Sequence, residues 1–193
     1  MHTTDVNIWD ELSIELTVLD QAIHEPRVPL PESGGRASPR PGPALYLVWY
    51  TGDLPMYRAV ADGCWPLYAG SAMSGSERLA RHRRNTRPVR NLRGGRDLWV
   101  VALPMPSRAA ALYLEQLVID RLQTVWNVKV LAGGFGSRGQ GATRRAQVAP
   151  PWSRIHPGRV VGSGTPTVTT AFLRKRIEEH LRATARPLWP PLT

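Results

Sequence analysis

A small set of side chains in this 193-residue chain combines a carboxylate, a guanidinium and two phenols in an order that suggests chemistry on a phosphate ester. Arg78 and His82 are four residues apart, so they share one face of a helix on which an arginine can hold a phosphate. Glu115 lies among leucines, and one carboxylate is enough for magnesium, which fills its other positions with water and phosphate. Phosphodiester hydrolysis needs such charge stabilisation together with an activated water. The candidate set is Tyr46, Tyr68, Arg78, His82, Glu115 and Asn127.

Each of these residues also has an ordinary structural explanation. Tyr46 and Tyr68 could be core aromatics whose hydroxyls are satisfied internally. A lone histidine on a helix is more often structural than catalytic, and a helix glutamate is usually solvated. Asn127 could simply cap the helix that contains Glu115.

The positive charge of the chain is concentrated in one segment. The formal net charge is +10, and 23 of the 25 basic residues are arginines. Eight arginines and no acidic residue occur between Arg78 and Arg96, a segment called here the arginine ridge. Such a ridge could be a solvated surface, but its density favours a polyanionic partner, nucleic acid before membrane. The DNA contacts predicted in the ridge are Arg81, Arg83, Arg84, Arg87, Arg90 and Arg93.

Composition excludes several other classes of protein. With 42% hydrophobic residues, the chain can bury a core, so disorder throughout is excluded. A single cysteine, Cys64, excludes disulfide scaffolds and cysteine-based zinc sites. No apolar run approaches the length of a membrane span, and the N-terminus has no signal-peptide pattern, so we expect a cytoplasmic protein without a membrane partner.

Patterning predicts an α/β (α+β) fold in which helices flank a three-stranded, mixed or antiparallel sheet. Apolar and aromatic runs indicate strands at residues 44–50, 65–72 and 97–103, the first two as a hairpin. Helical spacing indicates helices at residues 8–23, 76–84, 108–126 and about 170–183. We expect three parts: residues 1–43 as a helix and a Pro/Gly-rich arm, 44–128 as the core, and 129–193 as a basic loop and C-terminal helix packed with that core.

Specific side chains are predicted to end or bury these helices. Ser76 and Ser107 are candidate N-caps. The inward-facing residues are predicted to be Leu112, Leu117 and Leu122 in one helix and Phe172, Leu173, Ile177 and Leu181 in the last.

In order and spacing, the candidate set resembles the GIY-YIG nuclease superfamily. Within it the chain is most similar to the small type II restriction endonucleases that cut CCGCGG, the SacII specificity. The segments that carry the likeness span about residues 44–159: YTG at Tyr50, PLYAG at Pro66, RLARH at Arg78, LEQLVIDRLQTVWNV at Leu114, GGFG at Gly133 and WSRIHPGR at Trp152. Ala69 and Ser71 depart from the family pattern, and Ser71 replaces a lysine.

The resemblance implies a role for each catalytic candidate. Tyr46 would be the general base, assisted by Tyr68, with His82 as the competing base or a relay. Arg78 would hold the scissile phosphate. Glu115 would bind Mg²⁺, or Mn²⁺ in its place, and Asn127 would hydrogen-bond a metal-bound water or a tyrosine hydroxyl. Because a phenol has a pKa near 10, the base role requires a neighbouring metal or arginine that lowers this value.

The resemblance also implies the partners. We expect a homodimer that cuts double-stranded DNA at a short, GC-rich palindrome, with a cognate DNA methyltransferase as a genetic rather than a physical partner. The further DNA contacts expected are Arg138, Arg144, Arg145, Arg154, His156 and Arg159. The alternatives are another GIY-YIG nuclease, of repair or a mobile element, or a DNA-binding module without catalysis.

Overall fold

The architecture is a four-stranded antiparallel sheet between two helices. The structure is a computed structural model, and it describes residues 17, 19–22, 24–33, 42–128, 151–158 and 168–185. The strands are β1 (Val28–Pro29), β2 (Ala44–Tyr50), β3 (Tyr68–Ala72) and β4 (Leu98–Pro104), in the order β1-β4-β2-β3. Every residue of β2 is buried, as its apolar sequence predicts for a central strand. The predicted α+β class is confirmed.

The sheet has one strand more than the sequence predicts. Residues 28 and 29, expected to lie in an extended arm, form β1 and pair with β4, so that Val28 lies opposite Val100. A proline lacks a backbone N–H and is therefore tolerated in an edge strand. The short 3₁₀ helix η1 (Leu30–Glu32) follows and buries Leu30 completely. Part of the predicted arm therefore belongs to the core.

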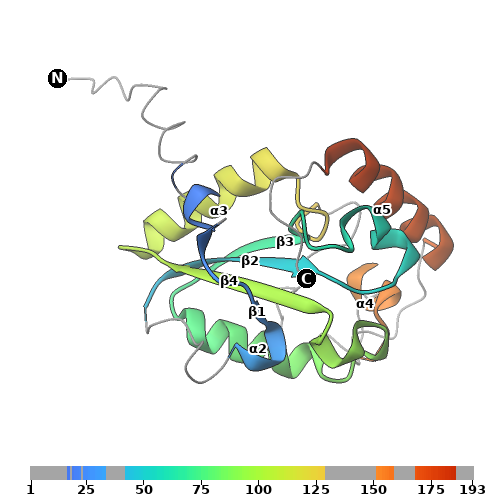
Figure 1. The fold of residues 1–193 in the computed structure, drawn as a ribbon, viewed down its shortest axis with the longest axis horizontal. Coiled ribbons are helices and arrows are strands. Elements are labelled where there is room, and N and C mark those ends of the chain that lie inside the picture. The colour runs from blue at the N-terminus through green and yellow to red at the C-terminus, as the bar shows by residue number, and fades with distance from the viewer. Residues whose placement is uncertain are drawn as a thin grey trace.

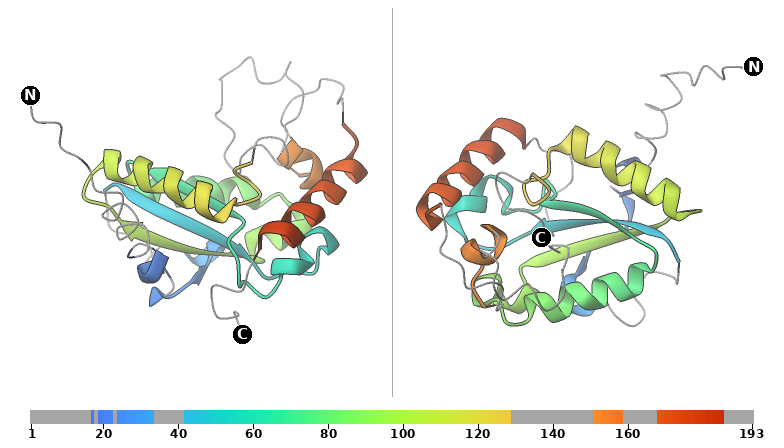
Figure 2. Two further views of the ribbon diagram at one scale, coloured as in Figure 1. Left: turned by 90° about the horizontal axis from the view of Figure 1, so that it is seen from above. Right: turned by 180° about the vertical axis from the view of Figure 1, so that it is seen from behind.

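Helices α2 (Gly75–Thr86) and α3 (Arg108–Leu122) cover opposite faces of the sheet (Figure 1). The two short helices at one end of the sheet are η3 (Pro55–Val60), between β2 and β3, and η4 (Arg90–Gly95), between α2 and β4. Helices α4 (Pro151–Ile155) and α5 (Thr170–Thr184) pack there, with α5 against η3 (Figure 2). The sequence did not predict α4.

Two details of the predicted helices are wrong. The N-cap of α2 is Ser74, which accepts a hydrogen bond from the backbone of Glu77, rather than Ser76. Leu112 and Phe172 are exposed, at 47% and 54%, because α3 turns Ala111, Leu114, Val118 and Leu122 inward and α5 turns Leu173, Ile177 and Leu181 inward. The predicted Ser107 cap of α3 is confirmed, since its hydroxyl accepts from the backbone of Ala110.

Within the described residues, no helix is both long enough and apolar enough to cross a bilayer. The described part of the predicted N-terminal helix, at residues 17, 19–22 and 24, is helical.

The burial of Leu30 predicts a large loss of stability on truncation. Leu30→Ala should lower the free energy of unfolding by about 2–5 kcal/mol, because it leaves a cavity where β1 and η1 meet the sheet. Leu112→Ala, the same change at an exposed site, should cost less than about 1 kcal/mol. Denaturant unfolding of both variants measures the difference. Equal, small losses would show that the β1 segment does not contribute to the core.

Candidate functional site

A cluster of polar side chains fills the space between the sheet and α2. The Tyr46 hydroxyl lies 3.0 Å from Nε2 of His82, and Nε of Arg78 donates to the same hydroxyl at 2.9 Å. The ring of Tyr68 packs beside both, with centroids 5.9 Å from Tyr46 and 6.1 Å from His82. Four of the six predicted catalytic residues therefore meet at one place, called here the tyrosine cluster.

Two sequence features bring the cluster together. Arg78 and His82 are one turn apart on α2, and the turn carries His82 into the core, where it is 1% exposed. Tyr46 pairs with Gly70 across the β2–β3 ladder. A Cβ at Gly70 would collide with the Tyr46 hydroxyl, so the glycine lets the phenol lie flat against β3.

The cluster holds the Tyr46 phenol in its protonated form. Burial raises the pKa of Tyr46 well above its ordinary value, and Tyr68 adds to this effect, while Arg78 opposes it. Arg78 donates to the phenol oxygen, and the phenol can donate to Nε2 of His82 when His82 is in the tautomer whose Nε2 carries no proton. Without DNA, the lowering effect of Arg78 does not outweigh burial, so the Tyr46 pKa is not brought down as the predicted base role requires.

Glu115 lies on the other side of the sheet edge. The hydroxyl of Ser71 donates to Oε2 of Glu115, which projects from α3 and is partly buried. Successive strand residues point to opposite faces, so Ser71 faces α3 whereas Tyr68 and Gly70 face α2. The carboxylate and the tyrosine cluster therefore flank β3, the edge strand.

The donor set around Glu115 fits magnesium better than a metal that needs a protein cage. Among the described residues, no group of three or more His, Cys, Asp or Glu could hold a metal ion. Magnesium needs only one or two protein carboxylates, because water and substrate phosphate supply the other ligands. Glu115, with one oxygen oriented by Ser71, provides that minimum.

Asn127 fastens the free edge of β3. Its Oδ1 accepts from the backbone N–H of Ala69 at 2.9 Å, and its Nδ2 donates to the Ala69 carbonyl at 2.8 Å. The Thr124 hydroxyl also donates to this Oδ1. The left-handed C-cap of α3 is Gln123, so Asn127 does not cap the helix. Its amide thus replaces a strand neighbour and positions β3.

His156 is the centre of a buried network, which argues against the DNA contact predicted for it. The residue is 0% exposed, and its Nε2 lies 2.7 Å from the hydroxyl of Tyr57. The same hydroxyl accepts from Nε1 of Trp126, while Nδ1 of His156 lies 3.1 Å from Oδ1 of Asn91. The network joins η3, η4, α4 and the segment that contains Asn127.

The glycine of HPGR has a packing role too. Gly158 has a φ of +133°, and a Cβ there would collide with the backbone carbonyl of Pro88. The described part of this motif therefore packs against the loop that follows α2.

The predicted DNA-contacting arginines differ in their surroundings. Arg83 is partly buried, and the exposed members of the ridge are Arg81, Arg84, Arg87, Arg90, Arg93 and Arg96. Arg154 is partly buried and donates to the backbone carbonyl of Val168. The predictions for Arg138, Arg144, Arg145 and Arg159 lie outside the described residues.

Sequence reasoning missed several residues that hold the site. Ser71 was noticed only as a departure from the family pattern, although it orients Glu115. Tyr57 and Asn91 carry no motif, and only the structure shows that Trp126 and His156, which lie in WNV and HPGR, meet through Tyr57. The sequence offered one signal for this contact, because the WNV and HPGR motifs occur together in the family that the chain resembles.

Comparison with known proteins agrees with this geometry. The family model described as the Eco29kI GIY-YIG domain matches residues 71–181, more than half of the chain. The match includes Ser71, Arg78, His82, Glu115 and Asn127 and begins after Tyr68. None of the curated proteins compared with the chain matches it.

The burial of His156 predicts a pH-dependent stability. Burial lowers its pKa from 6.5 to about 3, so between these values the unfolded chain binds a proton that the folded chain does not. This contribution to stability is complete above pH 6.5 and falls by about 1.4 kcal/mol per pH unit as the pH drops toward 3. Unfolding free energies across this range should show a shallower slope for His156→Gln than for the wild type. His24→Gln, at an exposed histidine, should keep the wild-type slope; equal slopes in all three proteins would contradict the prediction.

Proposed function

The chain belongs to the Eco29kI GIY-YIG family and is a type II restriction endonuclease, and from this premise we propose how its residues cut DNA and at which sequence. Members of this family act on DNA and are typically metal-dependent. The observation that carries the proposed mechanism is the contact between Arg78 and the Tyr46 hydroxyl, because it sets a phosphate-binding group beside a group that can move a proton.

We propose that Tyr46 and His82 act as one proton-accepting pair. A buried, protonated phenol is a poor base by itself, because its phenolate would be destabilised by burial. The Tyr46 hydroxyl is within hydrogen-bond distance of Nε2 of His82 and can give its proton to that nitrogen while its oxygen takes one from the attacking water. Tyr46 then remains neutral throughout, and the positive charge forms on His82. The general base and the relay are thus two members of the same step.

Arg78 and Glu115 would act on the phosphate from the two sides of β3. Arg78 is only partly buried. Its guanidinium also interacts with Tyr68, and the N–H donors that neither tyrosine engages would bind the scissile phosphate. Glu115 would hold Mg²⁺, which supplies charge stabilisation on the phosphate oxygens. A phosphate that meets both would lie across the outer edge of β3, near Gly70 and Ser71.

The proposed recognition site is CCGCGG, cut by a homodimer. The similarity of the YTG, PLYAG, RLARH, WNV, GGFG and HPGR segments to the enzymes of this specificity supports the sequence. A palindrome with two scissile bonds is matched by a two-fold symmetric protein. Base contacts would come from Arg138, Arg144, Arg145 and Arg159, because arginine recognises guanine by paired hydrogen bonds.

Replacement of the proposed metal ligand should stop cleavage without unfolding the protein. Glu115→Gln should lower the rate of plasmid cleavage in Mg²⁺ by at least about 10³-fold, since it removes the charge that binds the metal. Binding of the same DNA without a divalent metal should stay within about twofold. Glu179→Gln, at an exposed glutamate of α5, is the matched control and should cut normally. Wild-type cleavage by Glu115→Gln would refute the assignment of the metal to this residue.

The specificity predicts discrete DNA fragments with a shared end sequence. Digestion of a phage genome in Mg²⁺ should give discrete bands, and sequencing of the fragment ends should place every cut within CCGCGG. Cuts within a different shared palindrome would agree with a restriction enzyme but would refute the CCGCGG specificity. A smear with random ends would refute sequence-specific cleavage.

A further inference from the structure

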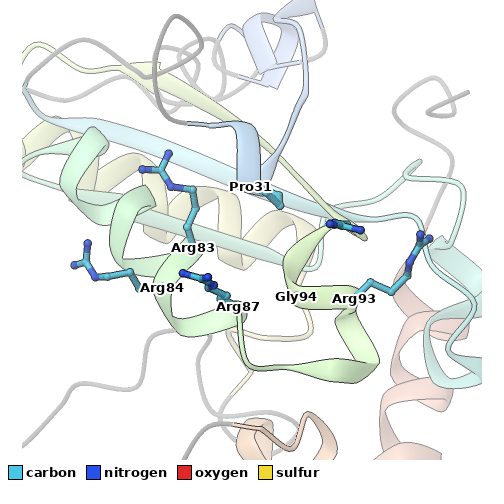
Figure 3. A pocket seen from close by; sticks show the side chains of 7 residues that line it. Pro31, Arg83, Arg84, Arg87, Arg93 and Gly94 are labelled. Atoms are coloured by element: carbon cyan, nitrogen blue, oxygen red, sulfur yellow. The ribbon is translucent and has the colours of Figure 1, made fainter.

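The arginine ridge folds into a hollow that lies apart from the tyrosine cluster. The hollow has a volume of about 460 Å³ between α2, η1 and η4. None of the described lining residues is acidic. Pro31 and five arginines line the hollow: Arg83, Arg84, Arg87, Arg93 and Arg96. Figure 3 shows Arg83 and Arg84 extending from α2, Arg87 from the position just after α2, and Arg93 from the η4 loop. This group of residues is called here the arginine pocket.

The η4 side of the pocket has a fixed conformation. Arg93 adopts a left-handed backbone, with φ of 49°, which an L-residue rarely takes without surrounding support. Its side chain forms an ion pair at 3.5 Å with Asp97, which is itself almost fully buried. Gly95 also has a positive φ, and a Cβ there would lie 2.7 Å from Oγ1 of Thr86 on α2. The loop and the helix are therefore closely packed, which keeps Arg93 near the arginines of α2.

Helix geometry separates the pocket from the scissile phosphate. Arg87 follows Arg78 by nine residues, which on an α-helix corresponds to a rotation of roughly 180° and a rise of about 14 Å. Arg78 points to Tyr46, so Arg87, which follows α2 and keeps a helical backbone, projects to the opposite flank. A single phosphate cannot contact both residues. Along B-DNA, about 14 Å corresponds to about four base-pair steps of one strand.

We propose that the arginine pocket binds backbone phosphates of the DNA that flanks the recognition site. This inference rests on the proposed cleavage of a six-base-pair palindrome. With α2 running along the DNA axis, as the proposal requires, four base-pair steps from a bond near the middle of a six-base-pair site lead past its last base pair. Five guanidinium groups, of which Arg93 is already paired with Asp97, repel one another unless a further anion neutralises them, and paired guanidinium hydrogen bonds fit phosphate oxygens. The pocket would add affinity for long DNA without reading any base.

The test compares duplexes that differ only in the length of their flanks. One duplex carries the cleaved site with two base pairs on each side, and the other carries it with twelve. The double variant Arg84→Gln/Arg87→Gln removes two exposed charges from the pocket, and Arg174→Gln/Arg176→Gln removes two exposed charges from α5 as the matched control. Affinity is measured without a divalent metal over a series of salt concentrations, and cleavage is measured in Mg²⁺.

We expect the pocket variant to bind the long duplex about tenfold more weakly than the wild type, with a salt slope smaller by about 1 to 2. Binding and cleavage of the short duplex should equal the wild type, and the control should match the wild type on both. Equal losses on both duplexes would overturn the proposal, because the pocket would then contact the site itself. No loss on either duplex would overturn it as well.

Two further readouts separate related explanations. In a thermal unfolding assay, inorganic phosphate is added to the wild type and to the pocket variant. Stabilisation of the wild type alone, together with equal binding of the long duplex by the two proteins, would assign the pocket to a free anion and overturn the proposal. Cleavage of the long duplex by the wild type tests the proposed function separately. If the wild type does not cut the long duplex, the proposed function is wrong. If the wild type cuts normally but the pocket variant loses no more affinity for the long duplex than for the short one, only the proposed role of the arginine pocket is wrong.

Discussion

The positions of the tyrosine cluster and of Glu115 depend on strand β3, which is held in place along both of its edges. On its inner side the ladder with β2 sets Gly70 opposite Tyr46, and on its outer side Asn127 occupies the two outward backbone groups of Ala69. An edge strand normally leaves such groups open, and here one side chain satisfies both. A shift of β3 by one residue would move Tyr68 to the face of α3 and Ser71 to the face of α2, which would exchange the environments of the phenol and of the group that orients Glu115.

The buried His156 network serves the same constraint at a distance. Trp126 donates to Tyr57 through its side chain and to the Leu67 carbonyl through its backbone, and the next residue is Asn127. Asn91, which completes the network, lies in η4 and so connects this support to the loop that carries Arg93. Because the lowered pKa of His156 keeps it neutral, the network brings no charge into the core. The neutral histidine allows four separate chain segments to be joined without the cost of a buried ion.

What the sequence could predict follows from how local each signal is. The apolar run of β2, the four-residue spacing of Arg78 and His82, and the Ser107 cap are local, and the structure has all three. β1 was missed because two residues carry no periodicity and only β4 makes them a strand. The inward faces of α3 and α5 were partly wrong, since several registers place leucines or a phenylalanine on one side and only packing selects among them. The contacts of Ser71 with Glu115 and of Tyr57 with His156 join residues 44 and 99 positions apart, so no window of sequence contains them.

The charges of the tyrosine cluster explain why a phenol is useful there. Arg78 is the one formal cation among the four side chains, and the phenol it touches stays neutral because burial opposes the phenolate. In the proposed mechanism, a scissile phosphate brings negative charge to Arg78, and this charge favours a proton arriving on His82 more than it favours a second negative charge on Tyr46. The positive charge on His82 then develops only as the water is deprotonated, when the phosphate also gains charge. Stabilisation that appears in the transition state and is absent before it is the kind that accelerates the reaction. The buried hydrogen bond between Tyr46 and His82 therefore suits a hydrolytic step better than a preformed phenolate would.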